Sequence, residues 1–195
     1  MAIYESEKME RHIVRLLQNE GLLGKVLLMK PYLALQQVIE AAGGICAADD
    51  GETQPDVIVF CMGLSEKTAQ ILKKKAEQFR CPILLAEGNA GWVPLALAAL
   101  SGGERFHALY EMCGCPSFTE KSMDECLSAV GFKLYAKDDI MGQVLEENVL
   151  ENAFEAPGAQ LHKTLCGITE TTVPSAQTMQ FVRLYRWTET SEQKT

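Results

Sequence analysis

SFTEKSMDECLSAVGFKL, residues 117–134, contains the clearest helix signal in the chain and the strand that follows it. The Thr119 hydroxyl can accept a hydrogen bond from the unpaired N–H groups of a first helical turn, so it is a natural N-cap. Met123, Leu127 and Val130 recur at helical spacing and predict one apolar helix face, which ends at Gly131. The pattern predicts a helix that leads into a strand over residues 132–135.

Upstream of this unit, short and continuously apolar runs alternate with amphipathic segments. Runs of this kind are typical of strands buried on both faces of a parallel sheet. The predicted strands cover residues 25–29, 45–48, 56–62 and 82–86. The predicted helices cover residues 6–20, from Pro31 to residue 42, and 66–79, with Ser6 and Ser65 as caps of the first and last. The alternation predicts an α/β fold with helices on both faces of the sheet.

The last third of the chain differs in pattern. Residues 101–117 are predicted to form a loop, residues 141–154 and 159–167 to be helical, and residues 178–187 to form an antiparallel strand at a sheet edge. The domain organisation that we expect is an N-terminal helix (1–22), one α/β domain (23–187) and a flexible tail (188–195).

Composition narrows the range of functions. The 195 residues are 47% hydrophobic, which excludes an intrinsically disordered chain, and carry a formal charge of −8, which argues against nucleic-acid binding. No apolar run has the roughly 18 residues of a membrane span, and the first residues lack the features of a signal peptide. Seven cysteines without such a signal predict free thiols in a cytoplasmic protein.

Residues 117–134 resemble the FFT-x-x-S element, with its terminal Gly-Phe, of class I S-adenosylmethionine-dependent methyltransferases. The similarity is greatest to the branch often fused to glycosyltransferases. SAQTMQFV, residues 175–182, resembles the T-Y-Q-F-V last strand of that branch. The resemblance implies a Rossmann-like three-layer sandwich with an antiparallel last strand, S-adenosylmethionine as cofactor, and partners among enzymes of glycan or cell-surface assembly.

The cofactor-binding half departs from the family pattern. A glycine-rich turn should follow the first strand, so that backbone can approach the cofactor closely. Residues 28–34 instead read LMKPYLA, with Lys30, Pro31 and Tyr32 at the turn. Too few residues separate Asp50 from the next strand to hold the family's third strand and helix. We therefore expect an abbreviated sheet and a non-catalytic domain that has lost ordinary S-adenosylmethionine binding, with no cofactor.

An active methyltransferase with an atypical cofactor loop is the alternative. In that case Lys30 and Tyr32 would face S-adenosylmethionine, Asp49 or Asp50 would hold its ribose, and Asn89 would flank the substrate. The sequence Asp-Asp-Gly is also a common turn, which favours a structural role for both aspartates. No residue is predicted to be a general base.

Two further interpretations remain. His107, Cys113, Cys115 and Cys126 could supply metal ligands, but C-x-C spacing is unlike the usual zinc motifs, so no metal is expected. Residues 26–89 also resemble a response-regulator receiver, without its acidic pair and phosphoacceptor aspartate, which would make the chain an interaction domain. In the abbreviated sheet, residues 45–48 should form an exposed edge that pairs with a protein partner or a second copy.

Overall fold

A computed structural model describes residues 9–51, 53–93, 95–96, 99, 104–141 and 178–188. Its strands are β1 (Lys25–Leu28), β2 (Ile45–Ala47), β3 (Val57–Cys61), β4 (Ile83–Gly88), β5 (Phe132–Lys137), β6 (Ile140–Met141) and β7 (Thr178–Trp187). Its helices include α1 (Met9–Asn19), α2 (Leu33–Ala41), α3 (Glu66–Phe79), α5 (Glu104–Met112) and α6 (Glu120–Ser128). The strands form one sheet in the order β2-β1-β3-β4-β7-β5, and β6 also pairs with β7.

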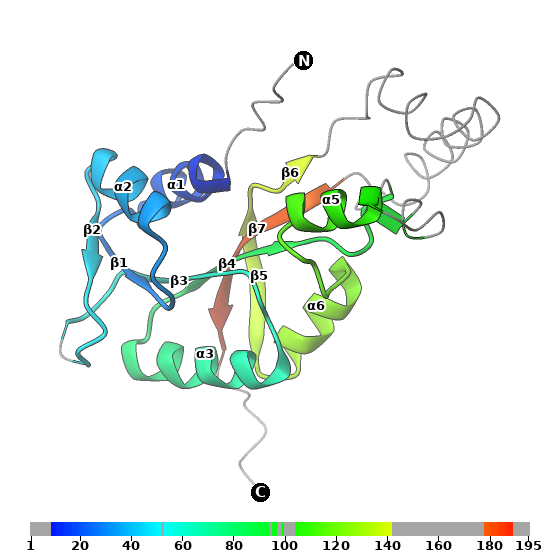
Figure 1. Cartoon of the computed structure of the whole chain (residues 1–195). Coiled ribbons are helices and arrows are strands. Elements are labelled where there is room, and N and C mark those ends of the chain that lie inside the picture. Colours follow the sequence, from blue (N-terminus) through cyan, green and yellow to red (C-terminus); the bar gives the residue numbers. More distant parts are fainter. Residues whose placement is uncertain are drawn as a thin grey trace, which may run out of the picture.

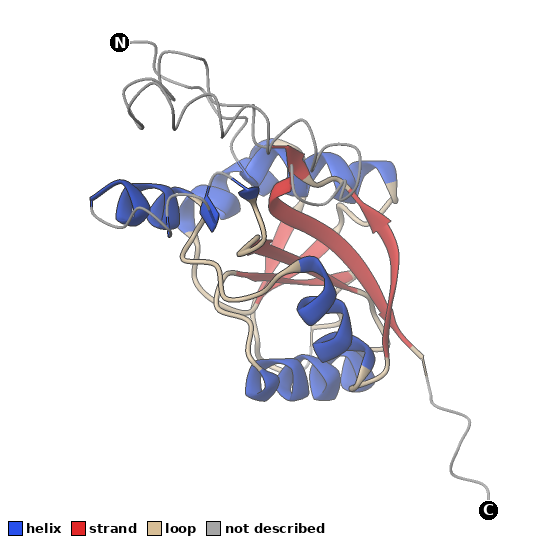
Figure 2. Ribbon diagram, turned by 90° about the vertical axis from the view of Figure 1, so that its right-hand side faces the viewer, coloured by secondary structure: helices blue, strands red, loops and turns tan. Residues whose placement is uncertain are grey.

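Helices cover both faces of this sheet, which gives three layers (Figures 1 and 2). Successive side chains of a strand point to opposite faces. Val57 and Val59 of β3 therefore join the core beneath α1 and α2, whereas Ile58 and Phe60 join the core beneath α3 and α6. The continuously apolar runs of the sequence reflect this burial on both sides, as predicted.

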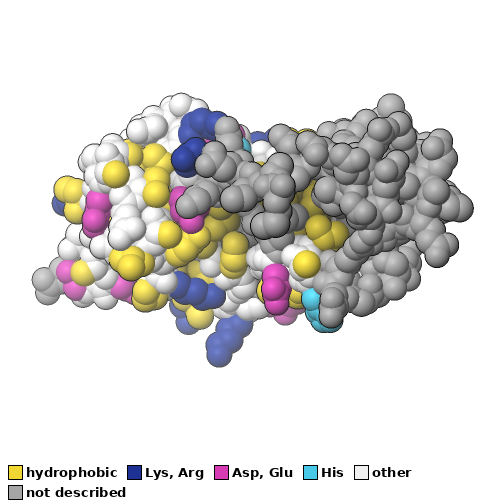
Figure 3. All heavy atoms as spheres, turned by 45° about the horizontal axis from the view of Figure 1, so that its top comes forward, with side chains coloured by type: hydrophobic (Ala, Val, Ile, Leu, Met, Phe, Trp, Pro, Cys, Tyr) yellow, Lys and Arg dark blue, Asp and Glu magenta, His cyan; other side chains and the backbone are white. Residues whose placement is uncertain are grey.

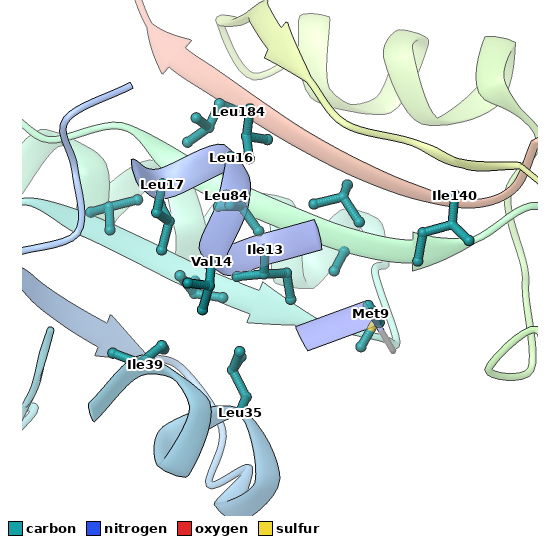
Figure 4. Packing of buried hydrophobic residues seen from close by; sticks show 14 of the residues in the cluster. Met9, Ile13, Val14, Leu16, Leu17, Leu35, Ile39, Leu84, Ile140 and Leu184 are labelled. Atoms are coloured by element: carbon teal, nitrogen blue, oxygen red, sulfur yellow. The ribbon is translucent and has the colours of Figure 1, made fainter. Parts of the chain in front are cut away.

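The core on the α1 side is built from one face of each helix (Figure 4). In α1 the buried apolar residues recur every three or four positions, as an amphipathic helix requires. Leu35 and Ile39 of α2 approach the same region, and Leu84 and Leu184 contribute from the sheet. The N-terminal helix is thus part of the hydrophobic core of the α/β domain.

Two of the predicted helix caps are present. The Thr119 hydroxyl accepts a hydrogen bond from Ser122 N at 3.3 Å, and Ser122 Oγ accepts one from Thr119 N at 2.9 Å, which makes a reciprocal capping box. The Ser65 hydroxyl accepts from Thr68 N at 3.1 Å at the start of α3. Pro31 lies one residue before Tyr32, the N-cap of α2, and not in the first turn as expected.

The predicted antiparallel strand is confirmed, but its predicted edge position is wrong. Strand β7 runs antiparallel to β4 on one side and to β5 on the other. Its first eight residues are buried, because both neighbours and both helical layers cover it. This strand order also overturns the receiver interpretation, since receiver domains have a parallel sheet of order 2-1-3-4-5 with no antiparallel strand inserted.

The sheet is abbreviated, as the sequence predicted. Residues 48–51 and 53–56, which connect β2 to β3, contain no helix or strand. Strand β2 therefore forms one edge of the sheet, and β5 forms the other. The architecture is a Rossmann-like three-layer α/β sandwich whose mostly parallel sheet contains the antiparallel strand β7 between β4 and β5.

Two other expectations for the later part of the chain were wrong. Residues 101–117 were expected to form a loop, but residues 104–112 form α5. The glycines and cysteines that suggested a loop lie on either side of this helix. Met141 belongs to β6 and does not begin a helix. The predictions for Ser6, for residues 142–167 and for the tail after residue 188 lie outside the described residues. In the part of the chain that the structure describes, no helix is long and apolar enough to cross a membrane.

Candidate functional site

The candidate site lies where the parallel strands β1, β3 and β4 end. In open α/β sheets, ligands bind outside the carboxyl ends of the strands. Lys30, Met62 and Asn89 follow closely after these three strands, and we call the region around them the carboxyl edge. The cofactor turn implied by the sequence resemblance would also lie there, after β1.

The turn after β1 is bound to the turn after β3. Met29 N donates a hydrogen bond to Val59 O at 3.0 Å, which extends the pairing of β1 with β3. The Lys30 ammonium donates to Met62 O at 3.0 Å and lies 4.7 Å from the centroid of the Phe60 ring. The charge of Lys30 is therefore engaged by groups of β3 and of the turn that follows it.

Tyr32 binds the N-terminal helix. Its hydroxyl donates a 2.5 Å hydrogen bond to Oε1 of Glu10, a buried residue of α1. Burial, and then the hydrogen bond to this carboxylate, raise the pKa of Tyr32. The phenol thus stays protonated as a donor, and the pair ties α1 to the turn after β1.

Cys61, the last residue of β3, is a weak acid in this environment. Burial, followed by the nearby carboxylates of Glu10 and Glu87, raises the pKa of Cys61 to about 12, although Lys30 acts in the opposite direction. Thiols react as thiolates, so a neutral thiol is a poor nucleophile. Cys61 is not suited to covalent catalysis.

Glu87 is a buried carboxylate at the end of β4, with 1% of its surface exposed. Burial raises the pKa of Glu87, while hydrogen bonds from the backbone of Leu64, Gly63 and Gly88 oppose that shift. The contact from Leu64 N to Oε2 measures 2.9 Å. Glu87 therefore anchors the connection between β3 and α3 to β4.

The loop between α5 and α6 lies directly against this edge. A Cβ atom on Gly88 would lie 2.1 Å from Cys113 O, so the end of β4 and the loop meet at backbone distance. A Cβ atom on Gly114 would lie 2.6 Å from Sδ of Met62. Gly88 has no room for a side chain, and Gly114, with a φ of 81°, has the left-handed backbone conformation that favours glycine.

Asn89 has a clear structural role. Its side-chain nitrogen donates to Thr178 O at 2.7 Å, and its side-chain oxygen accepts from Gly91 N at 2.8 Å. The residue is buried and holds the start of β7 beside the end of β4. These contacts occupy both polar atoms of the amide.

Asp49 and Asp50 follow the carboxyl end of β2. Asp49 pairs with Lys75 on α3, and Asp50 accepts hydrogen bonds from Thr53 N at 2.9 Å and from Thr53 Oγ1 at 3.0 Å. The aspartates thus form a turn that follows the carboxyl end of β2, and their carboxylates are engaged by Lys75 of α3 and by Thr53.

Sequence reasoning missed two buried carboxylates of this region, Glu10 and Glu87. Glu87 had a visible signal, because it is the one charged residue in the apolar strand ILLAEG. Glu10 had none, since a glutamate in the first turn of a helix is ordinary. Only the approach of α1 to α2 reveals its contact with Tyr32.

The proposed cysteine ligands do not converge. Cys113 belongs to the core on the α1 side, and Cys126 packs against the core on the α3 side. Within the described ranges, no group of three or more histidine, cysteine or acidic side chains is placed to hold a metal ion.

The surface on the α1 side is mixed in character. Hydrophobic side chains gather in the middle of this face, with positively and negatively charged side chains beside them (Figure 3). Leu33, at the start of α2, is 68% exposed.

No family model matches the sequence, and no curated protein matches it. Among solved structures, a candidate methyltransferase from Bacillus halodurans C-125 is similar, with 10% identity, a TM-score of 0.47, and coverage of 89% of this chain and 97% of that chain. The plantazolicin methyltransferase BamL, bound to a triazolic desmethylPZN analog and SAH, has 11% identity and a TM-score of 0.46, with coverage of 94% and 87%. A candidate sarcosine dimethylglycine methyltransferase from Galdieria sulphuraria has 9% identity and a TM-score of 0.41, with coverage of 93% and 85%.

Proposed function

We propose that this chain is a methyltransferase-like domain that has lost ordinary S-adenosylmethionine binding and acts as a non-catalytic binding or scaffolding module. One observation carries the proposal. The turn after β1 has no glycine, and its Tyr32 side chain hydrogen bonds to Glu10 of the chain's own first helix.

The physical reason lies in what the cofactor needs. A glycine-rich turn lets backbone N–H groups approach the ligand without interference from side chains. Pro31 has no N–H to offer, and Tyr32 adds a ring whose hydroxyl already donates to a carboxylate. Neither residue supplies what the glycine-rich turn supplies.

The acidic residues add support. A ribose-binding carboxylate must be available at the carboxyl edge, next to the turn after β1. Asp49 is paired with Lys75, and Asp50 holds Thr53 in a local turn. Both carboxylates are already engaged by groups of this chain, so a cofactor ribose would have to compete with Lys75 or Thr53 for its acidic partner.

Titration calorimetry with S-adenosylmethionine and its demethylated product tests this proposal. The protein concentration should allow a Kd of about 100 μM to be detected, which corresponds to about −5.5 kcal/mol. We expect no heat of binding from folded protein. A saturable signal with either ligand would overturn the proposal and favour an active methyltransferase with an atypical cofactor loop.

The partner that we propose for the scaffold is a second copy of this chain, paired through β2. The two sheet edges differ in their protection against pairing. Strand β5 carries Lys133 and Lys137 and a register shift near Tyr135, features that discourage edge pairing, whereas Ile45 to Ala47 of β2 are uncharged and Ile45 is 62% exposed. In the parallel ladder with β1, the backbone N–H and C=O of Cys46 point outward.

Cys46→Pro is a sharp test of that pairing, because it removes an outward N–H and leaves the inward bond from Ile45 N to Gly24 O in place. We expect light scattering to give a dimer for the parent chain and for Cys46→Ala, and a monomer for Cys46→Pro. A monodisperse monomer for the parent chain would contradict self-association through β2.

Charge and cysteine content bear on the partners and the location that we propose for the protein. The formal charge of −8 supports protein partners over nucleic acid. The described cysteines are free thiols, which supports a reducing, cytoplasmic location.

A further inference from the structure

Met62 has an unusual backbone conformation. Its φ is 58°, in the left-handed region that residues other than glycine rarely adopt. Two hydrogen bonds hold it there, from Met62 N to Ala86 O at 2.8 Å and from the Lys30 ammonium to Met62 O at 3.0 Å. Strain of this kind persists only where the surroundings enforce it, and it gathers at functional sites.

The side chain of Met62 is pressed against the α5–α6 loop. A Cβ atom on Gly114 would lie 2.6 Å from both Sδ and Cε of Met62, so the thioether lies along the bare backbone of Gly114. The next residue, Cys115, is also left-handed, with a φ of 53°. Two strained turns from distant parts of the sequence therefore meet at the carboxyl edge.

The loop that Met62 contacts contains a buried thiol, that of Cys113. Cys113 has no exposed surface, and its carbonyl lies against Gly88 at the end of β4. The loop is closed by hydrogen bonds from Gly114 N to Glu111 O at 2.9 Å and from Cys115 N to Tyr110 O at 2.8 Å. Cys115 itself is exposed.

We propose that Met62 is a wedge that holds residues 113–116 closed over the ends of β3 and β4. The chain thereby blocks its own carboxyl edge, in the region where related folds bind ligands. This inference rests on the proposed loss of cofactor binding, and it identifies the contact that controls access to the same site. A flexible thioether is suited to the role, because it fills irregular spaces and can move without breaking a polar contact.

The two cysteines of the loop provide the test. Burial raises the pKa of Cys113 to about 12, so the closed loop protects this thiol both sterically and by keeping it protonated. Native protein would be treated with iodoacetamide at pH 8, and the alkylation of each cysteine followed over time by tandem mass spectrometry. Cys115 should react in every variant and serves as the internal standard.

Met62→Ala removes the wedge, and Met62→Leu is the matched control, since it retains most of the side-chain volume. We expect Cys113 to be alkylated at least tenfold faster in Met62→Ala than in the parent chain, and within threefold of the parent rate in Met62→Leu. Cys81, buried in the core on the α3 side, should react at an unchanged rate.

Two results would overturn the proposal. Unchanged protection of Cys113 in Met62→Ala would show that the loop closes without the wedge. Equal acceleration at Cys113 and Cys81 would show that the substitution loosens the whole fold and not this loop. The labelling needs no ligand, so its failure is distinct from the failure of the proposed function, which calorimetry on the parent chain reports.

Discussion

Asp138 and Asp139 are adjacent in the chain, yet they bind arginines that lie on opposite faces of the sheet. Asp138 accepts hydrogen bonds from Arg15 of α1, at 2.6 Å from Nε and at 2.9 Å from a terminal nitrogen. Asp139 accepts from Arg183 of β7, at 2.7 Å from a terminal nitrogen, and Arg183 also pairs with Glu120 of α6 at 2.6 Å. The short corner between β5 and β6 therefore fastens a helix on each face.

Arg183 should be the most sensitive charged residue of this corner. It is 1% exposed, and Arg183→Ala would deprive the mostly buried carboxylate of Asp139 of its nearest cation, leaving Lys137 at 3.9 Å. We expect the free energy of unfolding in urea to fall by about 3–5 kcal/mol. Arg186→Ala, an exposed position on the same strand, is the control and should cost less than about 1 kcal/mol. Equal effects of the two substitutions would contradict the structural role of Arg183.

Asp138 should contribute to acid sensitivity. Burial acts to raise the pKa of its carboxyl, but the hydrogen bond from Arg15 and the electrostatic effects of the neighbouring His12 and Arg15 outweigh burial and lower it. A carboxyl whose pKa is depressed in the folded state stabilises the protein above its unfolded pKa, and this contribution is lost as the pH falls through the folded pKa.

We therefore expect the urea midpoint of Asp138→Asn to fall less steeply below pH 4 than that of the parent chain. Asp49→Asn, which affects an exposed ion pair with Lys75, serves as the control and should follow the parent profile. Parallel profiles for the parent chain and Asp138→Asn would argue against the contribution of this carboxylate.

The hydrogen bond from Tyr32 to Glu10 predicts a measurable coupling between the two residues. The hydroxyl–carboxylate contact is short and partly buried, so it is stronger than an exposed neutral bond. A double-mutant cycle with Tyr32→Phe and Glu10→Ala should give a coupling of about 1.5 kcal/mol in urea unfolding. Tyr135→Phe combined with Glu10→Ala should be additive, because Tyr135 contacts Arg186 instead. Additivity in both cycles would show that the first contact adds nothing to stability.

Loss of the capping box of α6 should reduce the stability of the fold by a smaller amount. Thr119→Ala removes the oxygen that accepts from Ser122 N, and it should destabilise the fold by about 1 kcal/mol. Ser117→Ala, at an exposed position just before the helix, should change stability by less than about 0.5 kcal/mol. Thermal unfolding of the two variants beside the parent chain distinguishes these values.

Local features of the structure could be predicted from residues 117–134 and from the strand runs. A cap and a helical apolar face depend on residues within a few positions of one another, so Thr119 and Ser65 were identified correctly. The abbreviated connection after β2 was also visible, because the few residues between two apolar runs leave no room for a strand and a helix. The absence of glycine from the turn at Lys30 to Tyr32 could likewise be seen directly in the sequence.

The position of β7 and the groups around the carboxyl edge could not be predicted in this way. The run of β-forming residues over 178–187 indicates a strand, but its neighbours β4 and β5 are chosen by hydrogen-bond pairing with residues 46 to 102 positions away. The contact between Met62 and Gly114 and the bond between Tyr32 and Glu10 likewise join segments that the sequence separates.

The sequence by itself thus determined the α/β class, the caps, the abbreviated sheet and the absence of a glycine-rich turn, since each depends on local propensity, spacing or chain length. The tertiary structure alone decided which side chains fill the space at that turn, how the loop around Cys113 closes, and which arginine each of the two adjacent aspartates binds. These contacts arise from packing between distant segments, whose geometry is set only when both helical layers close on the sheet.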